Sequence, residues 1–434
     1  MPEKFQPPRG TRDFLPEEMI IRQKILNKIK SVFESFGFQP LETPAIESWE
    51  VLAAKGAGGP EILEETYNFE DKGGRRVGLK YDLTIPLSRV MASNPSLPLP
   101  FKRYQIEKVW RYGDITKNRY REFWQADIDT VGTENMLADA EIVACTIVVF
   151  TSLGFKNFIV KLNNRKILSA LVKSVGVEEE KIMDVFRAID KLGKIGVENV
   201  EKELIDRGIL RNTAKKILEF IKIKGKPEVV LKKAEKFVKD IKEGKEGVEE
   251  LRQLISYLRK MGVEPKFKVD LSLARGLDYY TGPVFEVLVA DVVESLAGGG
   301  RYDKMIGLFL GRNIPATGIS LGIERIIEVM KDRGMIKPQK SMVKVFVVNV
   351  NDRVVDDSLK IVQMLRKNGM LVDFDLKGRT LTRQLEYVDS MKIPYALIVG
   401  EKELKRKVVK LRDMERRTES EVKISELVKT LKKL

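Results

Sequence analysis

The chain has 434 residues, of which 43% are hydrophobic and 32% are charged, a balance that permits a sizeable core and excludes wholesale disorder. This length predicts two or three domains of ordinary size. The single cysteine, Cys145, excludes an internal disulfide framework and any site built from several thiolates. Histidine is absent, which excludes Ser-His-Asp catalysis and histidine-ligated metals. Any chemistry must therefore use carboxylates, Lys, Arg, Tyr, backbone groups or an oxygen-bound metal.

The formal net charge of +15 is concentrated in two parts of the chain. Residues 164–266 contain 25 Lys and Arg against 18 Asp and Glu, and residues 341–434 contain 21 against 14. Two basic parts beside a nearly neutral remainder favour a polyanionic partner that is held away from the active site. The alternative is a Lys- and Glu-rich solvated surface of the kind found in heat-adapted proteins.

The sequence contains no membrane or targeting signal. No apolar run approaches the roughly 20 residues that span a bilayer. The opening sequence, MPEKFQPPRGTRDFLPEE, has neither the apolar core of a signal peptide nor the Arg and Ser bias of a transit peptide. We therefore expect a soluble, cytoplasmic protein.

A helix and short extended stretches open the chain. Residues 17–36 place apolar side chains at helical spacing, and Gly37 ends the run. Residues 38–48 are extended and include Pro44, which cannot donate a hydrogen bond to a sheet ladder, so an edge or interface strand is expected. Residues 76–81 indicate a further short strand.

A long antiparallel hairpin is predicted next. Residues 101–112 read as a strand, and residues 120–132 alternate like a returning strand after the polar turn at 113–119. Residues 134–152 return to helical spacing, and their apolar composition predicts a buried, unreactive Cys145.

The remaining patterns divide the chain into domains. Residues 1–163 and 267–330 are predicted to form one body, which is interrupted by a Lys- and Glu-rich helical insertion at 164–266. Residues 331–341 form a linker. Residues 342–434 alternate strands and helices, which predicts a small α/β domain with a mixed or parallel sheet.

Four groups of residues are candidates for chemistry, and the first lies on the hairpin. Arg111 is on one limb, Arg119 and Arg121 follow the turn, and Phe123 is on the return limb. Strand alternation lets side chains on one face converge on one ligand. A flat ring beside guanidinium groups suits an adenine base and its phosphates. The alternative is an arginine-rich hairpin that is simply solvated.

Two further groups combine small and polar residues. The sequence YDLTIPLSR places Asp82 and Thr84 on one face. The sequence AGGGRYD at 297–303, followed by Gly318, permits close approach of the backbone to a ligand. In GIER, Arg325 lies where a strand runs into a helix, a position from which it can offer a cation to a phosphate. Alternatively, the glycines only let a strand pack beneath a helix.

The fourth group is the sequence RGLDYYTGPVFE. It brings Arg275, Asp278, Tyr279 and Tyr280 together in a stretch that is costly to bury without partners. Neighbouring residues of a strand face opposite ways, so we expect Tyr279 and Tyr280 to have different roles.

In the order of these motifs the chain resembles histidyl-tRNA synthetase, a class II aminoacyl-tRNA synthetase. The shared motifs run TPAIE, YDLT, WRY, RYREFWQADID, RGLDYYTGPVFE, GGGRYD and GIER, and the resemblance covers the whole chain. RGLDYYTG and GGGRYD are typical of the histidine pocket, whereas the others occur with several amino-acid specificities. The resemblance implies an α+β fold with an antiparallel catalytic sheet flanked by helices, a helical insertion and a C-terminal α/β anticodon-binding domain.

The resemblance also implies how ATP is bound. Arg111 and Arg325 would hold the α- and γ-phosphates, with Arg119 assisting and Phe123 stacking on the adenine. Arg275 would take the place of a charge clamp between the histidine carboxylate and the α-phosphate. The implied catalytic residues are therefore Arg111, Arg275 and Arg325.

The resemblance also implies which residues bind each end of the histidine substrate. Asp82 and Thr84 would bind the α-amino group, and Gln125 would lie at the carboxylate side. Asp129 and Tyr280 would read the imidazole nitrogens. The full implied histidine-binding set is Asp82, Thr84, Arg111, Gln125, Asp129, Arg275, Tyr279, Tyr280 and Tyr302.

The chain departs from the family pattern in two respects. Gly113 stands where many members have an acidic residue two positions after the hairpin arginine, and Asp114 follows it. Asp82 and Asp129 stand where many members have Glu, which shortens each side chain by one methylene.

The implied activity is histidine–tRNA ligase. ATP and Mg²⁺ would activate histidine to histidyl-adenylate and pyrophosphate, and a homodimer would then charge tRNA(His); the sequence identifies no Mg²⁺ ligands. This chemistry relies on positioning and charge neutralisation, so it needs no histidine side chain. For the same reason we expect kcat to vary little between about pH 6.5 and 8.5. The alternatives are a catalytically idle regulatory subunit of histidine biosynthesis or starvation sensing, and another class II specificity such as prolyl or glycyl.

Overall fold

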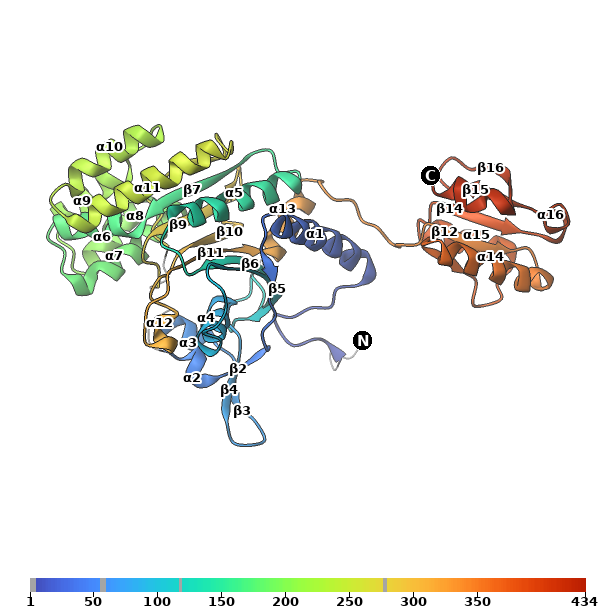
Figure 1. Ribbon diagram of the computed structural model, residues 1–434, viewed down its shortest axis with the longest axis horizontal. Coiled ribbons are helices and arrows are strands. Elements are labelled where there is room, and N and C mark those ends of the chain that lie inside the picture. Colours follow the sequence, from blue (N-terminus) through green and yellow to red (C-terminus); the bar gives the residue numbers. More distant parts are fainter. Residues whose placement is uncertain (1–4, 55–59, 117–118, 276–278) are drawn as a thin grey trace. The chain divides into compact units, whose positions relative to one another are not determined.

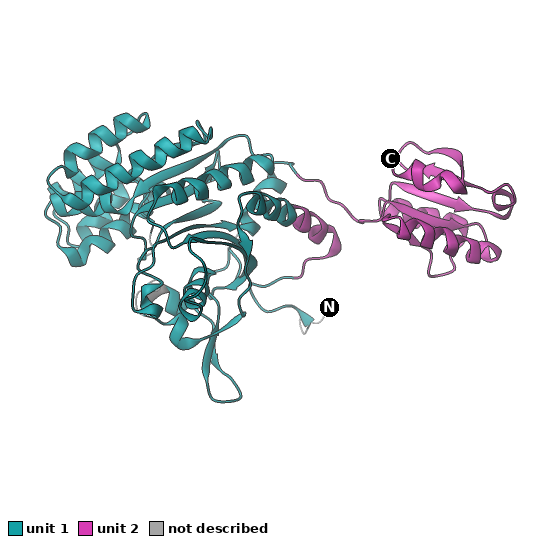
Figure 2. Cartoon of the chain, viewed as in Figure 1, with its two compact units in different colours: residues 1–12, 25–335 teal, residues 13–24, 336–434 magenta. Residues whose placement is uncertain are grey.

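A computed structural model of the chain describes residues 5–54, 60–116, 119–275 and 279–434. The chain forms two compact units, residues 1–12 with 25–335 and residues 13–24 with 336–434 (Figure 2). None of the described helices combines the length and the hydropathy that a membrane-spanning helix needs.

An eight-stranded sheet is the centre of the first unit (Figure 1). Its strand order is β1-β5-β6-β11-β10-β9-β7-β8, and only the two edge pairs, β1 with β5 and β7 with β8, are parallel. The antiparallel body of the sheet is thus as predicted. The strands are β1 Gln39–Pro40, β5 Phe101–Trp110, β6 Glu122–Val131, β7 Phe158–Asn164, β8 Phe267–Val269, β9 Pro283–Val289, β10 Ala297–Arg301 and β11 Ala316–Gly322.

The predicted hairpin is formed by β5 and β6, which pair from Phe101 opposite Val131 to Trp110 opposite Glu122. Helices α5 (Met136–Ser152), α11 (Lys242–Lys260) and α13 (Ile323–Asp332) pack against strands of the sheet. Because α5 is apolar on nearly all sides, it forms the core of the unit, and Cys145 is fully buried within it as expected.

The other elements of the first unit surround this sheet. A small sheet has the order β2-β4-β3. The elements are β2 Ile46–Ser48, α2 Trp49–Leu52, α3 Pro60–Glu65, β3 Asn68–Glu70, β4 Arg76–Leu79, α4 Thr84–Ser93 and α12 Gly307–Leu310. Helix α1, Pro16–Ser35, is divided between the units, since its residues up to 24 are assigned to the second unit.

Between β7 and β8 the chain is helical, as the Lys- and Glu-rich pattern predicts. Pro227 occupies the first position of α10, where its missing N–H removes no helical hydrogen bond. The helices before α11 are α6 Arg165–Ser174, α7 Ile182–Asp190, α8 Leu192–Asp206, α9 Arg211–Ile221 and α10 Pro227–Val238.

The second unit contains a five-stranded mixed sheet of order β13-β12-β14-β15-β16. Its β12 pairs in parallel with β13 and β14, whereas β15 and β16 are antiparallel, so the predicted mixed α/β sheet is confirmed. The elements are β12 Val345–Asn349, α14 Val355–Lys367, β13 Val372–Phe374, α15 Leu381–Ser390, β14 Tyr395–Val399, α16 Glu401–Lys405, β15 Val408–Asp413, β16 Thr418–Lys423 and α17 Leu427–Leu431.

Candidate functional site

Two adjoining cavities in the first unit collect every residue that the resemblance implies for binding ATP or histidine. Arg121, the other candidate arginine of the hairpin, is not among the described residues that line them. The main cavity, of about 220 Å³, is lined by parts of β6, β10 and β11 and by the start of α4. The inner cavity, of about 30 Å³, shares several of these lining residues. The predicted residues on the main cavity are Asp82, Thr84, Arg111, Arg119, Phe123, Gln125, Arg275, Tyr279, Tyr280 and Arg325, and those on the inner cavity include Asp129 and Tyr302. Asp278 lies outside the described residues.

Two of the predicted arginines are held by backbone carbonyls. Arg111 follows β5 directly, and its Nε donates to the Tyr81 carbonyl at 3.1 Å. Its guanidinium lies 4.2 Å from the ring centre of Tyr81 and 5.2 Å from that of Phe123. Arg325, in the first turn of α13, donates from Nη1 to the Ser295 carbonyl at 3.2 Å. Both cations are therefore fixed before any anion arrives.

Arg275 lies against the glycine-rich strand. A Cβ built at Gly298 of β10 would overlap the Arg275 guanidinium, so only glycine permits this approach. The Nη1 of Arg275 is 3.9 Å from Glu286 Oε1, and its backbone has a φ of 47°, in the left-handed region. Such a conformation in a non-glycine residue must be held by its surroundings.

Arg119 and Asp114 differ in their relation to the cavity. Arg119 lines it, and its Nη2 is 2.6 Å from Glu65 Oε1. A Cβ at Gly113 would come close to both Arg119 Nη2 and Glu65 Oε1, which are the mobile ends of their side chains and could move aside. Asp114 is exposed and is not among the described residues that line either cavity.

Asp82 lies at the start of a helix. Its Oδ1 accepts hydrogen bonds from the backbone N–H groups of Thr84 and Ile85, each at 3.0 Å, in the manner of a helix cap. The shared face predicted for Asp82 and Thr84 therefore arises from the first turn of α4. Burial raises the pKa of Asp82.

The expectation that Tyr279 and Tyr280 face opposite ways is wrong. Both line the main cavity, and their ring centres are 4.7 Å apart. The reason is that β9 begins only at Pro283, so strand alternation does not apply to the two tyrosines. The Tyr302 ring centre lies 6.1 Å from that of Tyr279, which completes an aromatic wall.

Asp129 contacts protein groups through both carboxylate oxygens, although its Oδ2 accepts no hydrogen bond from the described residues. Its Oδ2 is 2.8 Å from Nη2 of Arg103, and its Oδ1 accepts a hydrogen bond from the Tyr302 hydroxyl. A Cβ at Gly318 would overlap Asp129 Oδ1, so glycine makes room for this carboxylate. Burial raises the pKa of Asp129.

Sequence reasoning missed Asp127, which lines both cavities. It lies on the same face of β6 as Gln125 and Asp129, because alternate strand residues point the same way. Gln125 Nε2 donates to Ser320 Oγ at 2.8 Å, and the Ser320 side chain hydrogen-bonds to Asp127. Asp127 Oδ1 is buried without a hydrogen-bond partner among the described residues, and burial raises its pKa to about 7.

The two cavities thus have a cationic part and an acidic part. Arg111, Arg275 and Arg325 suit a polyphosphate and a carboxylate, whereas the buried carboxylates suit a ligand with an amino group or ring N–H groups. Among the described residues, no group of three or more Cys, Asp or Glu could hold a metal ion by itself.

The chain is similar to known proteins over its whole length. Residues 10–326 match the family model of histidyl-tRNA synthetase, and residues 344–434 match that of an anticodon binding domain. A histidine–tRNA ligase of Aeropyrum pernix is 40% identical over 99% of this chain and 98% of its own length. A histidine–tRNA ligase of Pyrococcus furiosus is 37% identical over 98% of each chain.

Solved structures agree with this comparison. The crystal structure of histidyl-tRNA synthetase from Nostoc sp. PCC 7120 has a TM-score of 0.88 and 34% identity and covers 99% of each chain. A Bacillus halodurans C structure described as an ATP phosphoribosyltransferase regulatory subunit/histidyl-tRNA synthetase has a TM-score of 0.77, covering 92% of this chain and all of its own. At 22% identity the second likeness shows the fold alone. The predicted class II fold is confirmed, and the chain belongs to the histidyl-tRNA synthetase family.

Proposed function

We propose that this chain is a histidine–tRNA ligase, which converts histidine and ATP to histidyl-adenylate and pyrophosphate and then charges tRNA(His). The observation that carries the proposal is the cavity in which four arginines meet a group of buried carboxylates. ATP and histidine together present the opposite pattern, a polyphosphate and a carboxylate joined to an amino group and an imidazole.

The cationic part would serve the first step. The histidine carboxylate attacks the α-phosphorus in line, the bond to the bridging oxygen breaks, and pyrophosphate leaves with its electron pair. Arg275 would neutralise charge between the carboxylate and the α-phosphate, while Arg111 and Arg325 would hold the α- and γ-phosphates. Phe123 would stack on the adenine, with Arg119 assisting at the phosphates.

Mg²⁺ would complete this charge neutralisation. It commonly binds through one or two carboxylates together with nucleotide phosphates and water, and needs no closed protein cage. Glu324 lines the main cavity next to Arg325 and is the carboxylate that would meet the ion. The bound ion would draw negative charge from the phosphates of ATP.

The acidic part would bind the amino acid. Asp82, Thr84 and Gln125 would hold the main-chain end. Asp129 and Tyr280 would face the imidazole, with Tyr279 and Tyr302 lining the pocket. Because Asp129 is already paired with Arg103, we add Asp127 to this set as an acceptor for a substrate N–H group.

The tRNA would be held by the two basic parts of the chain, the helical insertion at 164–266 and the anticodon-binding domain at 342–434. We also propose a homodimer that acts in the cytoplasm, where tRNA is charged. The exposed apolar residues Ile46 and Phe69 of the small sheet are candidates for the dimer surface. Light scattering of the full chain would test the dimer.

The regulatory-subunit alternative is not favoured. Every predicted pocket residue is present around the cavities, and the anticodon-binding match covers residues 344–434. The curated relatives that align over the whole chain are named histidine–tRNA ligases.

The decisive experiment is ATP–pyrophosphate exchange with each amino acid in turn. We expect exchange with histidine only, and Arg275→Ala should nearly abolish it while the protein stays folded. A loss smaller than about tenfold would remove Arg275 from the catalytic step. Exchange with another amino acid would overturn the specificity, and an inactive wild-type chain would favour the regulatory alternative.

A further inference from the structure

Three consecutive residues, where β7 ends and α6 begins, connect the helical insertion to the loop that carries Arg275. Asn163, Asn164 and Arg165 are all buried, with exposed fractions of 0%, 0% and 5%. None of them is among the described residues that line the main or the inner cavity, although Arg165 lines a neighbouring cavity of about 710 Å³ beside Tyr279 and Tyr280. Their side chains instead contact other parts of the first unit.

The side chains of Asn163 and Arg165 both donate hydrogen bonds to backbone carbonyls at the start of the loop. Asn163 Nδ2 donates to the carbonyls of Leu271 at 3.2 Å and Leu273 at 2.9 Å. Arg165 Nη1 donates to the carbonyls of Ala274 at 2.7 Å and Arg275 at 2.9 Å. A run of carbonyls is therefore satisfied from one short segment.

Arg165 also reaches the other end of the loop, since its backbone N–H donates to the Gly282 carbonyl at 2.9 Å. Arg275 needs this support, because its φ of 47° is unfavourable for any residue with a Cβ. Its guanidinium lies directly against Gly298, so a small backbone displacement would move the cation away from its place in the cavity.

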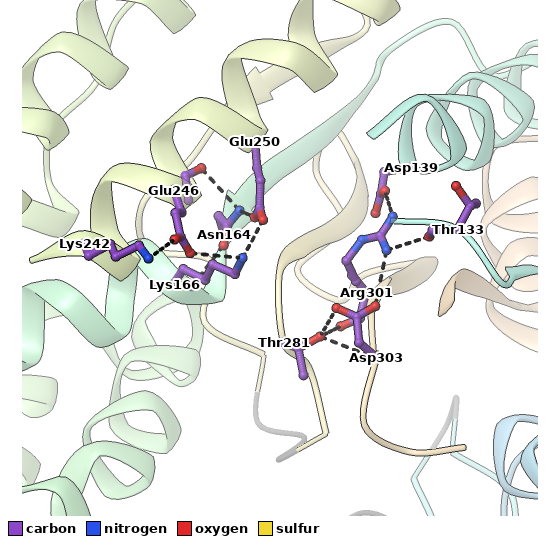
Figure 3. A network of polar contacts seen from close by, with 11 residues as sticks. Thr133, Asp139, Asn164, Lys166, Lys242, Glu246, Glu250, Thr281, Arg301 and Asp303 are labelled. Carbon is purple, nitrogen blue, oxygen red and sulfur yellow. Dashed lines mark hydrogen bonds and ion pairs between the residues drawn. The ribbon is translucent and has the colours of Figure 1, made fainter. Parts of the chain in front are cut away.

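The same segment contacts two helices of the insertion. Asn164 Nδ2 donates to the Gly247 carbonyl at 3.2 Å and to Glu250 Oε2 at 2.7 Å, both on α11 (Figure 3). The Arg165 guanidinium lies 4.0 Å from the ring centre of Phe186 on α7. Figure 3 also shows Lys166 bound to Glu250, which fixes the start of α6 to α11.

We propose that the segment 163–165 is a positioning element, which holds Arg275 in its adenylation geometry and couples that geometry to helices α7 and α11. Within it, Arg165 is a positioning residue that acts through Arg275. This inference rests on the proposed function, because it takes Arg275 to be catalytic. A shift of α7 or α11, such as tRNA bound to the insertion would impose, would then change the rate of adenylation.

The main test compares Arg165→Met, which keeps much of the side-chain volume but removes the guanidinium donors, with Arg165→Lys, which keeps one donor group. Pyrophosphate exchange is measured per active site, with sites counted from the burst of adenylate formation. We expect Arg165→Met to lower kcat about tenfold to a hundredfold, with smaller changes in KM for ATP and histidine. The lysine variant should retain an intermediate kcat.

The matched control is Arg207→Met. Arg207 also joins parts of the insertion, with Nη1 2.9 Å from Asp184 Oδ1 and Nη2 2.7 Å from Glu203 Oε1. It makes no hydrogen bond or ion pair with the described residues of the loop. Both methionine variants should lower the unfolding temperature, yet Arg207→Met should keep kcat within about twofold of wild type. If Arg165→Met does not fold, Phe186→Leu provides the test, with a smaller expected loss of kcat.

A double variant separates positioning from general damage. Arg165→Met should lower the residual activity of Arg275→Ala less than about threefold, because residues that act as a unit are not additive. If the effects of the two substitutions on the free energy of activation were fully additive, the positioning inference alone would be overturned. The same would follow if Arg165→Met kept the wild-type kcat while Arg275→Ala was inactive. Wild-type exchange by Arg275→Ala would instead overturn the proposed catalytic role of Arg275, and the inference with it.

Discussion

The three buried carboxylates of the site differ in what their oxygens already bind. Asp82 caps α4, and Asp129 Oδ1 accepts a hydrogen bond from Tyr302. Asp127 Oδ1 and Asp129 Oδ2 are both buried without a hydrogen-bond partner among the described residues, but Asp129 Oδ2 forms an ion pair with Arg103 at 2.8 Å. An unsatisfied buried acceptor is costly, so a substrate donor that reaches it gains more than a surface contact would give. Asp127 is therefore the carboxylate most available to histidine.

This availability has a consequence for the dependence of activity on pH. Burial raises the pKa of Asp127 to about 7, so in the free enzyme the acceptor is lost as the pH falls through that value. We expect kcat/KM for histidine to decrease on the acid side, beyond the decrease caused by the substrate's own imidazole. At saturating histidine a bound N–H group keeps Asp127 ionised, so kcat should stay nearly flat. The sequence-based expectation of a flat profile therefore stays a prediction for kcat and does not extend to kcat/KM.

Asp127→Asn is the variant that checks this assignment. It keeps the side-chain shape but removes the titration, so the additional acid limb of kcat/KM should disappear. KM for histidine should rise more than KM for ATP. Identical pH profiles of wild type and variant would show that Asp127 does not bind the amino acid.

The same pKa shift predicts an effect on stability. The pKa of Asp127 is raised from 3.8 to about 7 on folding, so the folded state holds a proton that the unfolded state releases between these values. Stability is thus present below about pH 4 and is lost as the pH rises towards 7. We expect Asp127→Asn to be more stable than wild type at pH 8, by roughly 2–4 kcal/mol, with the difference shrinking towards pH 4. Denaturation followed by tryptophan fluorescence reports the first unit, which contains all three tryptophans.

Removing Asp129 should have the opposite effect. Arg103 is fully buried and would lose the ion pair whose atoms lie 2.8 Å apart. We expect Asp129→Ala to lower the free energy of unfolding by about 3–5 kcal/mol, measured in the same fluorescence assay. Tyr302→Phe removes only the hydroxyl donor to Asp129 and should cost less than half as much. Unaltered stability of Asp129→Ala would show that water or a neighbouring group replaces Asp129.

At the scale of elements, local periodicity predicts the long strands and helices, whose residues alternate or repeat along one buried face. The hairpin of β5 and β6 and the helices α1, α5 and α13 follow from alternation or helical spacing. The parallel pairing of β1 with β5, and of β8 with β7, could not be predicted in this way. An edge strand of two or three residues is too short to show a periodic pattern, and its conformation depends on the strand with which it pairs. The error over Tyr279 and Tyr280 has a related cause, since strand character was extended past the Gly282-Pro283 boundary.

Site residues that belong to a recognisable motif can be predicted from the sequence, whereas residues outside the motifs are harder to predict. Asp127 could have been found, because it stands between Gln125 and Asp129 in the period-2 pattern of β6. The role inferred for Asn163 and Arg165 could not, because their side chains bind backbone carbonyls more than a hundred residues away, and a carbonyl carries no sequence signal.

The glycines of β10 and β11 offer a test at this scale. A Cβ at Gly318 would overlap Asp129 Oδ1, whereas a Cβ at Gly193, within α8, meets nothing within 4 Å. We expect Gly318→Ala to destabilise the first unit by roughly 1–3 kcal/mol and to raise KM for histidine, because it displaces Asp129. Gly193→Ala should be neutral or stabilise by up to about 1 kcal/mol, since alanine favours a helix. Equal stability of the two variants, measured by thermal unfolding, would contradict the packing described for β11.

At the scale of the whole molecule, the question is what the basic parts do. Several surface cations of the insertion are paired, as Arg252 is with Glu235, with 2.7 Å between Arg252 Nη2 and Glu235 Oε2. Such pairs fit the alternative of a solvated, heat-adapted surface. They do not account for the excess of 25 Lys and Arg over 18 Asp and Glu in residues 164–266. An excess of cations in two separate parts of the chain is what a long polyanion such as tRNA would use.

Deleting residues 342–434 separates the two steps of the reaction. The cavities are built entirely from the first unit, so the truncated chain should keep pyrophosphate exchange within about threefold of wild type. Charging of tRNA should fall at least about a hundredfold, because phosphate contacts made by the basic C-terminal part are lost.

The measurement is aminoacylation at several salt concentrations, with exchange in the same preparation as the control for folding. In the full chain log(kcat/KM) for tRNA should decrease steeply with log[salt], and in the truncated chain the slope should be smaller, since fewer counterions are released on binding. Charging that is unaffected by the deletion, or a salt slope equal in the two proteins, would contradict tRNA binding by residues 342–434 and leave their positive charge to the solvated-surface explanation.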